Sequence, residues 1–112
     1  MPAFVPDAGD LIWLSFDPQA GHEQAGRRPA LVLSPKPYNQ KSGLALVCPV
    51  TNQMKGYPFE VPAPPDCGVT GAFLADHVKS LDWKARQAER IGRIPPSTLN
   101  EVLARLAALL GY

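Results

Sequence analysis

The sequence contains few residues of the kinds that hold metals or act as nucleophiles. Its 112 residues include two histidines and two cysteines. Neither His22 nor His77 has a second metal-binding side chain three or four positions away, so the spacing encodes no zinc site. No glycine-rich segment leads into a Lys-Ser/Thr pair, which excludes nucleotide hydrolysis by a phosphate-binding loop. No serine lies in a nucleophile-elbow pattern. We therefore expect neither a metal nor another cofactor.

Targeting signals and membrane-spanning runs are also missing from the sequence. Residues 1–4 have neither the basic region nor the apolar stretch of a secretory signal peptide. No apolar run approaches the length of a membrane span. We expect a cytoplasmic, reduced protein with no membrane partner, in which Cys48 is a buried free thiol within an apolar run.

Proline and glycine, by contrast, are plentiful. Thirteen prolines and nine glycines, with 46 % hydrophobic and 19 % charged residues, argue for a globular protein that is not all-helical. A single domain covering residues 1–112 fits this length. Apolar stretches predict strands at 10–16, 30–34, 44–50, 59–61, 71–75 with Val78, and 88–93. The continuous run 44–50 predicts a central strand buried on both faces, with a bulge or edge at Pro49.

The helical signals lie at the end of the chain. After Pro95 and Pro96, apolar residues recur at helical spacing at positions 99, 102, 103, 106 and 110. Thr98 and Glu101 have capping-box spacing, and Gly111 suits a C-cap. Residues 38–43 predict a polar turn, and residues 80–86 a single helical turn. Five or more strands with one terminal helix predict a mainly β fold, a small bent antiparallel barrel with the helix at its side or end.

Charge is distributed unevenly along the chain, although the formal net charge is only +1. Residues 1–26 contain four acidic residues and no lysine or arginine, whereas residues 79–93 contain five basic and two acidic residues. Two interpretations of the second segment stay open. It is either a solvated face of mixed charge or a basic patch for nucleic acid or an acidic peptide.

The segment 23–29 organises the rest of the chain. Its polar loop ends in Arg27 and Arg28, and Pro29 then opens an apolar strand, since proline suits a strand's first residue or an edge. Arg28 is thereby held by a rigid element, and Arg27 is expected to project to the opposite side. A guanidinium in this place suits phosphate recognition. The alternative is that it covers the rim or pairs with Asp17 or Glu23.

Polar residues gather at three predicted strand ends that a small barrel can bring together. They are Glu23, Gln24, Arg27 and Arg28; Thr51, Asn52, Gln53 and Lys55; and Asp76, His77 and Lys79. The set is poor in nucleophiles and rich in phosphate-binding groups, which suits RNA cleavage by the substrate's own 2′-hydroxyl, a reaction that needs a base, an acid and positive charge.

Simpler interpretations of the same residues stay open. Thr51 could cap a turn, and Asp76 could pair with Lys79 at the surface. The two histidines could be solvated. Four aromatic residues could belong to the core or rim and not to a base-stacking surface: Phe16, Tyr38, Tyr57 and Trp83.

Four segments together resemble the MazF/PemK family of toxin endoribonucleases. They are VPDAGDLIWLSFDP, EQAGRRPALVLSP, TNQMKGYPFEV and ADHVKSLDWKAR, and the likeness runs from Phe4 to the terminal helix. The resemblance implies an SH3-like barrel of the MazF/Kid/CcdB type and a homodimer. It implies a metal-independent, sequence-specific endoribonuclease of single-stranded RNA that leaves 2′,3′-cyclic phosphate and 5′-hydroxyl ends. It also implies a MazE-like antitoxin whose acidic C-terminal segment covers the active site.

The resemblance assigns roles to particular residues. Arg28 takes the place of the family's essential arginine, Thr51 that of its essential threonine, and Glu23 is the candidate general base, with His22 as the alternative. Asn52 stands where relatives have a hydroxyl residue. The remaining candidates for RNA contact are His22, Gln24, Arg27, Gln53, Lys55, Asp76, His77, Lys79 and Arg86.

A second hypothesis belongs to another class of protein. A barrel toxin of similar fold could bind a protein such as DNA gyrase without nuclease chemistry, and the fold alone does not choose between the two. The Arg28 and Thr51 pair favours the nuclease, because a purely protein-binding toxin would not need it.

Overall fold

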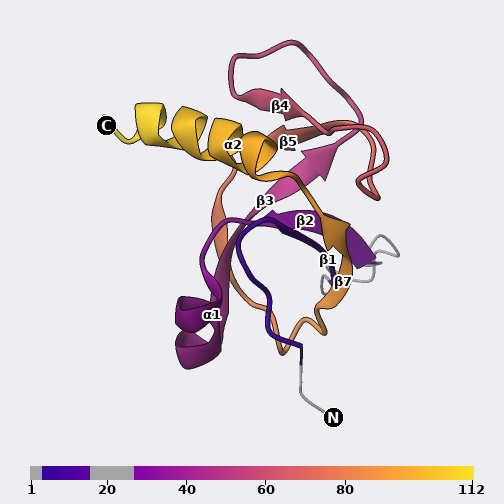
Figure 1. The fold of residues 1–112 in the computed structure, drawn as a ribbon, viewed down its shortest axis with the longest axis vertical. Coiled ribbons are helices and arrows are strands. Elements are labelled where there is room, and N and C mark those ends of the chain that lie inside the picture. The colour runs from indigo at the N-terminus through magenta and orange to yellow at the C-terminus, as the bar shows by residue number, and fades with distance from the viewer. Residues whose placement is uncertain (1–3, 16–26) are drawn as a thin grey trace, which may run out of the picture.

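The fold is a strongly bent antiparallel sheet with a helix packed on one side (Figure 1). The computed structural model describes residues 4–15 and 27–112. Within these ranges the elements follow the order β1 (Asp10–Ser15), β2 (Arg27–Val32), α1 (Lys36–Ser42), β3 (Leu44–Thr51), β4 (Glu60–Pro62), β5 (Ala72–Leu74), β6 (Lys79–Asp82), β7 (Glu89–Arg93) and α2 (Pro96–Leu109). The predicted mainly β, antiparallel architecture is confirmed. Neither helix of the described ranges is long and apolar enough to cross a membrane.

Strand β3 is the centre of the sheet because it pairs with three other strands. One edge pairs with β2, while the other pairs with β6 from Leu44 to Val47 and with β5 at Val50 and Thr51. On the second edge, Pro49 lies between the part of β3 that pairs with β6 and the part that pairs with β5. The missing N–H of proline therefore removes no pairing on this edge. The strand therefore continues to Thr51. The prediction that it is buried on both faces is wrong at Leu46, which is 37 % exposed.

The bent sheet encloses two apolar clusters, one on each face. Along β1 the side chains alternate as a strand requires. Leu11 belongs to the cluster that also contains Leu31 and Phe73, and Ile12 and Leu14 belong to the cluster that also contains Trp83. This alternation fixes which residues of β1 and β2 can face a site at the surface.

Helix α2 covers the first cluster with the predicted apolar stripe. Val102 is fully buried, and Leu99, Leu103 and Leu106 pack beside it, but Leu110 is 65 % exposed. The predicted capping box is wrong, since Pro95 is the N-cap and makes no side-chain capping bond. Glu101 pairs instead with Arg105, at 3.0 Å.

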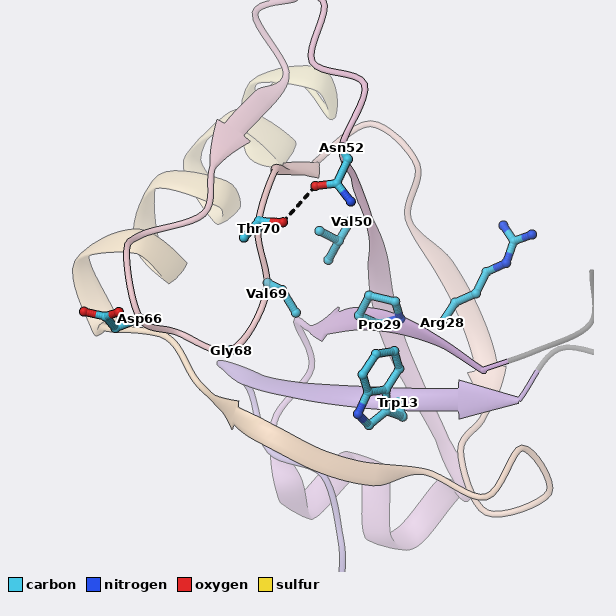
Figure 2. A pocket seen from close by; sticks show the side chains of 9 residues that line it. All are labelled: Trp13, Arg28, Pro29, Val50, Asn52, Asp66, Gly68, Val69 and Thr70. Carbon is cyan, nitrogen blue, oxygen red and sulfur yellow. Dashed lines mark hydrogen bonds between the residues drawn. The ribbon is translucent and has the colours of Figure 1, made fainter.

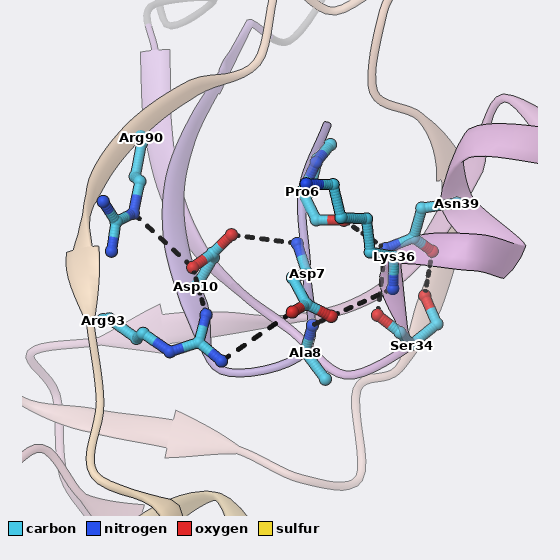
Figure 3. Close-up of polar contacts among 9 residues, drawn as sticks. All are labelled: Pro6, Asp7, Ala8, Asp10, Ser34, Lys36, Asn39, Arg90 and Arg93. Atoms are coloured by element: carbon cyan, nitrogen blue, oxygen red, sulfur yellow. Dashed lines mark hydrogen bonds and ion pairs between the residues drawn. The ribbon is translucent and has the colours of Figure 1, made fainter. Parts of the chain in front are cut away.

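A second helix replaces the turn predicted at residues 38–43. Helix α1 starts with a proline in its first turn, as is favourable there, and ends at Gly43 in the left-handed conformation. The Asn39 side chain is fully buried. Its amide nitrogen donates to the carbonyl oxygens of Pro6 and Ser34 at 2.8 and 2.9 Å (Figure 3). Tertiary contacts of this kind select the helix over an open turn.

The helical turn predicted at residues 80–86 is wrong in its first half, whereas in its second half the Arg86 N–H donates to the Asp82 carbonyl oxygen at 3.1 Å, as in a helical turn. Residues 79–82 form strand β6, because Lys79 to Asp82 pair with Val47 to Leu44 of β3. Trp83 then turns inward and donates its indole N–H to the Asn39 carbonyl oxygen at 3.0 Å.

Candidate functional site

Three pockets adjoin one another because successive pockets share lining residues, and we call them together the groove. The tryptophan pocket has a volume of about 640 Å³ and lies beside Trp13, Asn52 and Thr70. The middle pocket, of about 120 Å³, lies over Val47, Pro49 and Leu81. The loop pocket, of about 230 Å³, lies beside Thr51, Gln53, Lys55 and Asp76. Arg28 lines the first two pockets and His77 the last two, so these side chains join the groove.

Arg28 reaches the groove because of its position in β2. Its backbone pairs with Leu14, and the following Pro29 pairs with Trp13. Figure 2 shows the Arg28 side chain extending beyond Pro29 and away from the Trp13 ring. The guanidinium is exposed at the mouth of the strand, as its place before a proline predicted.

Arg27 lies on the other side of the strand, as predicted, and contacts β1 and β7. Its guanidinium donates to Ser15 Oγ at 2.5 Å, to the Gln87 carbonyl oxygen at 2.6 Å and to Glu89 Oε1 at 2.9 Å. Arg27 lines none of the three pockets. These contacts fix the edge strand β7 to the start of β2, and a contact of Arg27 with RNA stays a prediction.

Thr51 lies at the last position of β3, where the chain enters the loop to β4. Its Oγ1 accepts a hydrogen bond from the Gln53 N–H at 3.0 Å, so the hydroxyl does cap a turn. Because that oxygen already accepts one hydrogen bond, its own proton can be donated to a bound group.

Gly71 fixes the backbone beneath Thr51. It has a φ of +103°, and a side-chain carbon added there would lie 2.0 Å from the Thr51 carbonyl oxygen. Only glycine allows this approach. Strand β5 thus holds Thr51 in place through the pairing of Thr51 with Ala72.

The loop after Thr51 is fixed at its far end by Glu60, which the sequence pattern did not single out. The Glu60 side chain is buried, and its carboxylate accepts the N–H groups of Lys55 at 3.1 Å and of Gly56 at 3.0 Å. Arg105 of α2 donates to the Pro58 carbonyl oxygen. Since Glu60 follows Phe59 in an ordinary strand pattern, only the fold reveals this contact.

Asp76 and His77 lie next to each other at the end of the groove. The Asp76 carboxylate is 3.7 Å from His77 Nε2, and both side chains are substantially exposed. Among the described residues no ion pair joins Asp76 to Lys79. The simpler interpretation, in which Asp76 pairs with that lysine at the surface, is therefore wrong. Lys79 lines the middle pocket.

The other predicted site residues lie elsewhere. His22, Glu23 and Gln24 fall outside the described residues. Arg86 lies in the turn before β7, where its guanidinium donates to the Ser15 carbonyl oxygen at 3.3 Å, and it lines none of the three pockets. Trp13 also lines the groove, and the sequence pattern, which placed it within a predicted strand, did not single it out.

The cysteines contribute no reactive group to the groove. Cys48 is fully buried, and burial raises the pKa of its thiol to about 12, so it stays protonated and unreactive at neutral pH. Cys67 is also buried and free. In the described ranges no three His, Cys, Asp or Glu side chains come together in a way that could hold a metal ion.

The groove combines three kinds of group that together suit a nucleic acid. Arg28, Lys55 and Lys79 offer positive charge to phosphates. Thr51 offers a hydroxyl, and Trp13, a residue that is 38 % exposed, offers an aromatic ring. Unpaired bases bind to such mixtures by stacking and by hydrogen bonds to their edges.

Comparison with known proteins agrees with this chemistry. The family model of the PemK-like, MazF-like toxin of type II toxin–antitoxin systems matches residues 7–110. The endoribonuclease toxin MazF of Escherichia coli (strain K12) is 51 % identical over 108 residues, which is 96 % of each chain. The endoribonuclease PemK of Escherichia coli is 38 % identical and covers 93 % of this chain and 81 % of its own.

A solved structure is also closely similar. The MazE–MazF structure (Form-II) from Deinococcus radiodurans superimposes with a TM-score of 0.92 at 59 % sequence identity, covering 97 % of this chain and 98 % of that one.

Proposed function

The chain belongs to the MazF/PemK family of endoribonuclease toxins from type II toxin–antitoxin systems, and on that premise we propose that it cleaves single-stranded RNA at specific sequences without a metal ion. The observation that carries the proposal is the placement of Arg28 and Thr51 along one groove of adjoining pockets. Cutting messenger RNA would block translation and stop growth.

The proposed reaction needs no protein nucleophile. The 2′-hydroxyl oxygen of the RNA attacks the adjacent phosphorus as its proton passes to a base, and the bond from phosphorus to the 5′-oxygen breaks. The 5′-oxygen takes up a proton, which leaves a 2′,3′-cyclic phosphate and a 5′-hydroxyl. Glu23, or alternatively His22, is the proposed base; both lie outside the described residues.

Arg28 and Thr51 would stabilise the charge that builds up on the phosphate. A guanidinium can bind two phosphate oxygens at once. The Thr51 hydroxyl can donate its proton to the same phosphate, because its oxygen already accepts the Gln53 N–H. Donors fixed before the reaction stabilise a developing charge without the cost of reorganising water. Gly71 and the β3–β5 pairing provide that fixed position for Thr51.

We propose two protein partners. One is a second copy of the chain in a homodimer, and the other is a MazE-like antitoxin. The similar Deinococcus radiodurans structure is one of MazE with MazF. In this chain Arg28, Lys55 and Lys79 border the groove, which favours an antitoxin with an acidic C-terminal segment lying over it. Binding that is unchanged between low and high salt would argue for a mainly apolar interface.

The direct test is to incubate the purified protein with a long single-stranded RNA in the presence of EDTA and to sequence the new ends. We expect discrete cuts with 5′-hydroxyl and 2′,3′-cyclic phosphate ends. Intact RNA, with folded and antitoxin-free protein, would contradict the proposal. A gyrase supercoiling assay without RNA then tests the protein-binding alternative.

A further inference from the structure

The tryptophan pocket is the largest of the three pockets that form the groove, and one of its walls is flat and apolar. Trp13 and Pro29 are paired residues of β1 and β2, so their side chains lie together on one face of the sheet. Figure 2 shows the indole ring next to the Pro29 ring, with Val69 to the left of Pro29 and Val50 above it. The volume of about 640 Å³ has ample room for a nucleobase.

A single oriented amide faces this apolar wall. Asn52 lies just after β3, and its Oδ1 accepts a hydrogen bond from the Thr70 hydroxyl at 2.9 Å. The Thr70 loop thereby fixes the orientation of the amide. Since Oδ1 is engaged, the Nδ2 hydrogens are the groups that Asn52 can offer to a molecule in the pocket. Figure 2 shows Nδ2 turned toward Val50 and the interior of the pocket.

This amide also adjoins a residue of the proposed cleavage site. Asn52 follows Thr51 directly, and Arg28 lines the tryptophan pocket as well as the middle pocket. A phosphate held by Arg28 and Thr51 would therefore bring a neighbouring base of the same strand to the tryptophan pocket. RNA bases recognised in this way are unstacked, bound to an aromatic face and read at their edges.

We propose that the tryptophan pocket holds one nucleobase next to the cut, and that Asn52, oriented by Thr70, selects it. This inference rests on the proposed ribonuclease function. The Nδ2 donor matches the carbonyl oxygen at position 4 of uracil or position 6 of guanine. Cytosine and adenine have amino donors at those positions, so a donor that meets this part of the base edge discriminates against them. The pocket thus prefers uracil or guanine at one position of the cleavage sequence.

Changing Asn52 to aspartate tests the inference because it inverts the chemistry of the amide. The Thr70 hydroxyl can still donate to one carboxylate oxygen, and the other oxygen is now an acceptor. Asn52→Asp should therefore shift the preference at one position from uracil or guanine to cytosine or adenine, by about tenfold, as expected for one hydrogen bond. Thr70→Val, which removes only the hydroxyl, should relax the preference without inverting it.

The measurement is a map of cut ends on a long RNA for the wild type and both variants, with thermal unfolding recorded for each. Asn100→Asp is the matched control, since Asn100 is an exposed residue of α2 that lines none of the three pockets. A second readout is the binding of short RNAs that carry a 2′-deoxy sugar at the cut and differ only at the selected base. The affinity should change by the same factor as the cutting.

The outcomes separate the two proposals. An Asn52→Asp protein that cuts RNA with the wild-type sequence preference would overturn the base-selecting role and leave the ribonuclease function intact. A preference that changes equally in Asn100→Asp would also overturn it, because a remote change of charge would then suffice. Failure of the wild-type protein to cut RNA at all would overturn both proposals.

Discussion

Two charged regions of this molecule are built in opposite ways. In the first, Asp10 of β1 is almost fully buried. Its carboxylate accepts hydrogen bonds from the Arg93 guanidinium at 2.7 Å and from the Asp7 N–H at 2.9 Å, and the Arg90 guanidinium lies 3.5 Å away (Figure 3). We call this the Asp10 cluster. In the second, the groove, Arg28, Lys55 and Lys79 are exposed around pockets. The cluster directs its charges inward, and the groove directs them to solvent.

The same residue types therefore serve structure in one region and suit binding in the other. The Asp10 cluster fixes the N-terminal segment and β7 to β1 through partners that the chain itself supplies. The groove instead presents donors around hollows where another molecule fits. The neighbours Arg27 and Arg28 repeat this contrast within two residues. Arg27 donates to groups of β1 and of the region that begins β7, whereas Arg28 lines two pockets.

The largest effect should come from Arg28→Ala, which removes the cation proposed to stabilise the transition state. One such donor contributes about 3–4 kcal/mol, so the cleavage rate should fall by roughly a hundred- to a thousandfold. The protein should still fold, because the side chain is exposed and outside both apolar clusters. Single-turnover cleavage of an RNA with a mapped cut site measures the rate, and wild-type cutting would show that Arg28 has no catalytic role.

Arg27→Ala is the matched control for this prediction. It removes the same charge one position away, and we expect it to lower the stability because the contacts to Ser15, Gln87 and Glu89 are lost. Cleavage by the folded fraction should persist. A loss of cleavage equal to that of Arg28→Ala, at a temperature where the protein is folded, would contradict the division between the two arginines.

A smaller effect, and one on stability alone, should follow from Asp10→Asn in the Asp10 cluster. Removing one partner of a buried ion pair costs about 3–5 kcal/mol. Here Arg90 and Arg93 are about half exposed and can be hydrated, so we expect a loss of about 2–3 kcal/mol. Urea unfolding measures it. RNA cleavage per folded molecule should stay at the wild-type level, and a parallel loss of activity would argue that the cluster also shapes the groove.

The sequence predicted what depends on local pattern. Apolar stretches predicted β1 and β7, helical spacing predicted α2, and Pro29 predicted that Arg28 lies at the mouth of a strand. The predictions that failed depend on distant partners. Asn39 forms part of a helix because it contacts Pro6, and residues 79–82 form a strand because β3 lies beside them.

The site could be predicted only in part, for the same reason. Arg28 and Thr51 stand out in sequence because each lies beside a strand end or a proline. Glu60 and the Asn52–Thr70 pair do not, since each acts through a contact with a loop that no spacing rule connects to it. Trp13 could not be identified from the sequence, because every residue of an apolar run looks alike and the pattern does not show which of them faces a pocket.

A moderate effect should follow from Glu60→Gln, which tests how far the groove depends on internal contacts of the kind found in the Asp10 cluster. Oε1 of the carboxylate accepts the N–H groups of both Lys55 and Gly56, and Oε2 also accepts that of Lys55. In glutamine an NH2 group takes the place of Oε2 and faces the Lys55 N–H, and the negative charge that strengthens these bonds is lost, at a cost of about 1–2 kcal/mol. The loop that carries Gln53 and Lys55 should then lose its fixed position. We expect KM for RNA to rise by about tenfold with a smaller change in kcat. A loss of stability with KM unchanged would assign Glu60 a purely structural role.

The smallest effects should come from one exposed cation in each region, Arg90 and Lys79. Arg90→Ala removes a 3.5 Å contact of a half-exposed side chain, which contributes less than about 1 kcal/mol to stability, and it should leave RNA binding unchanged. Lys79→Ala should leave stability unchanged and weaken RNA binding up to about fivefold. If Lys79 contacts one phosphate, the slope of log affinity against log salt should also decrease by about 0.7. Affinity titrations at several salt concentrations measure both quantities. Counterions are released only where a cation meets a phosphate. Equal slopes of log affinity against log salt for the two variants would therefore mean that the groove and the Asp10 cluster do not differ in their contact with RNA.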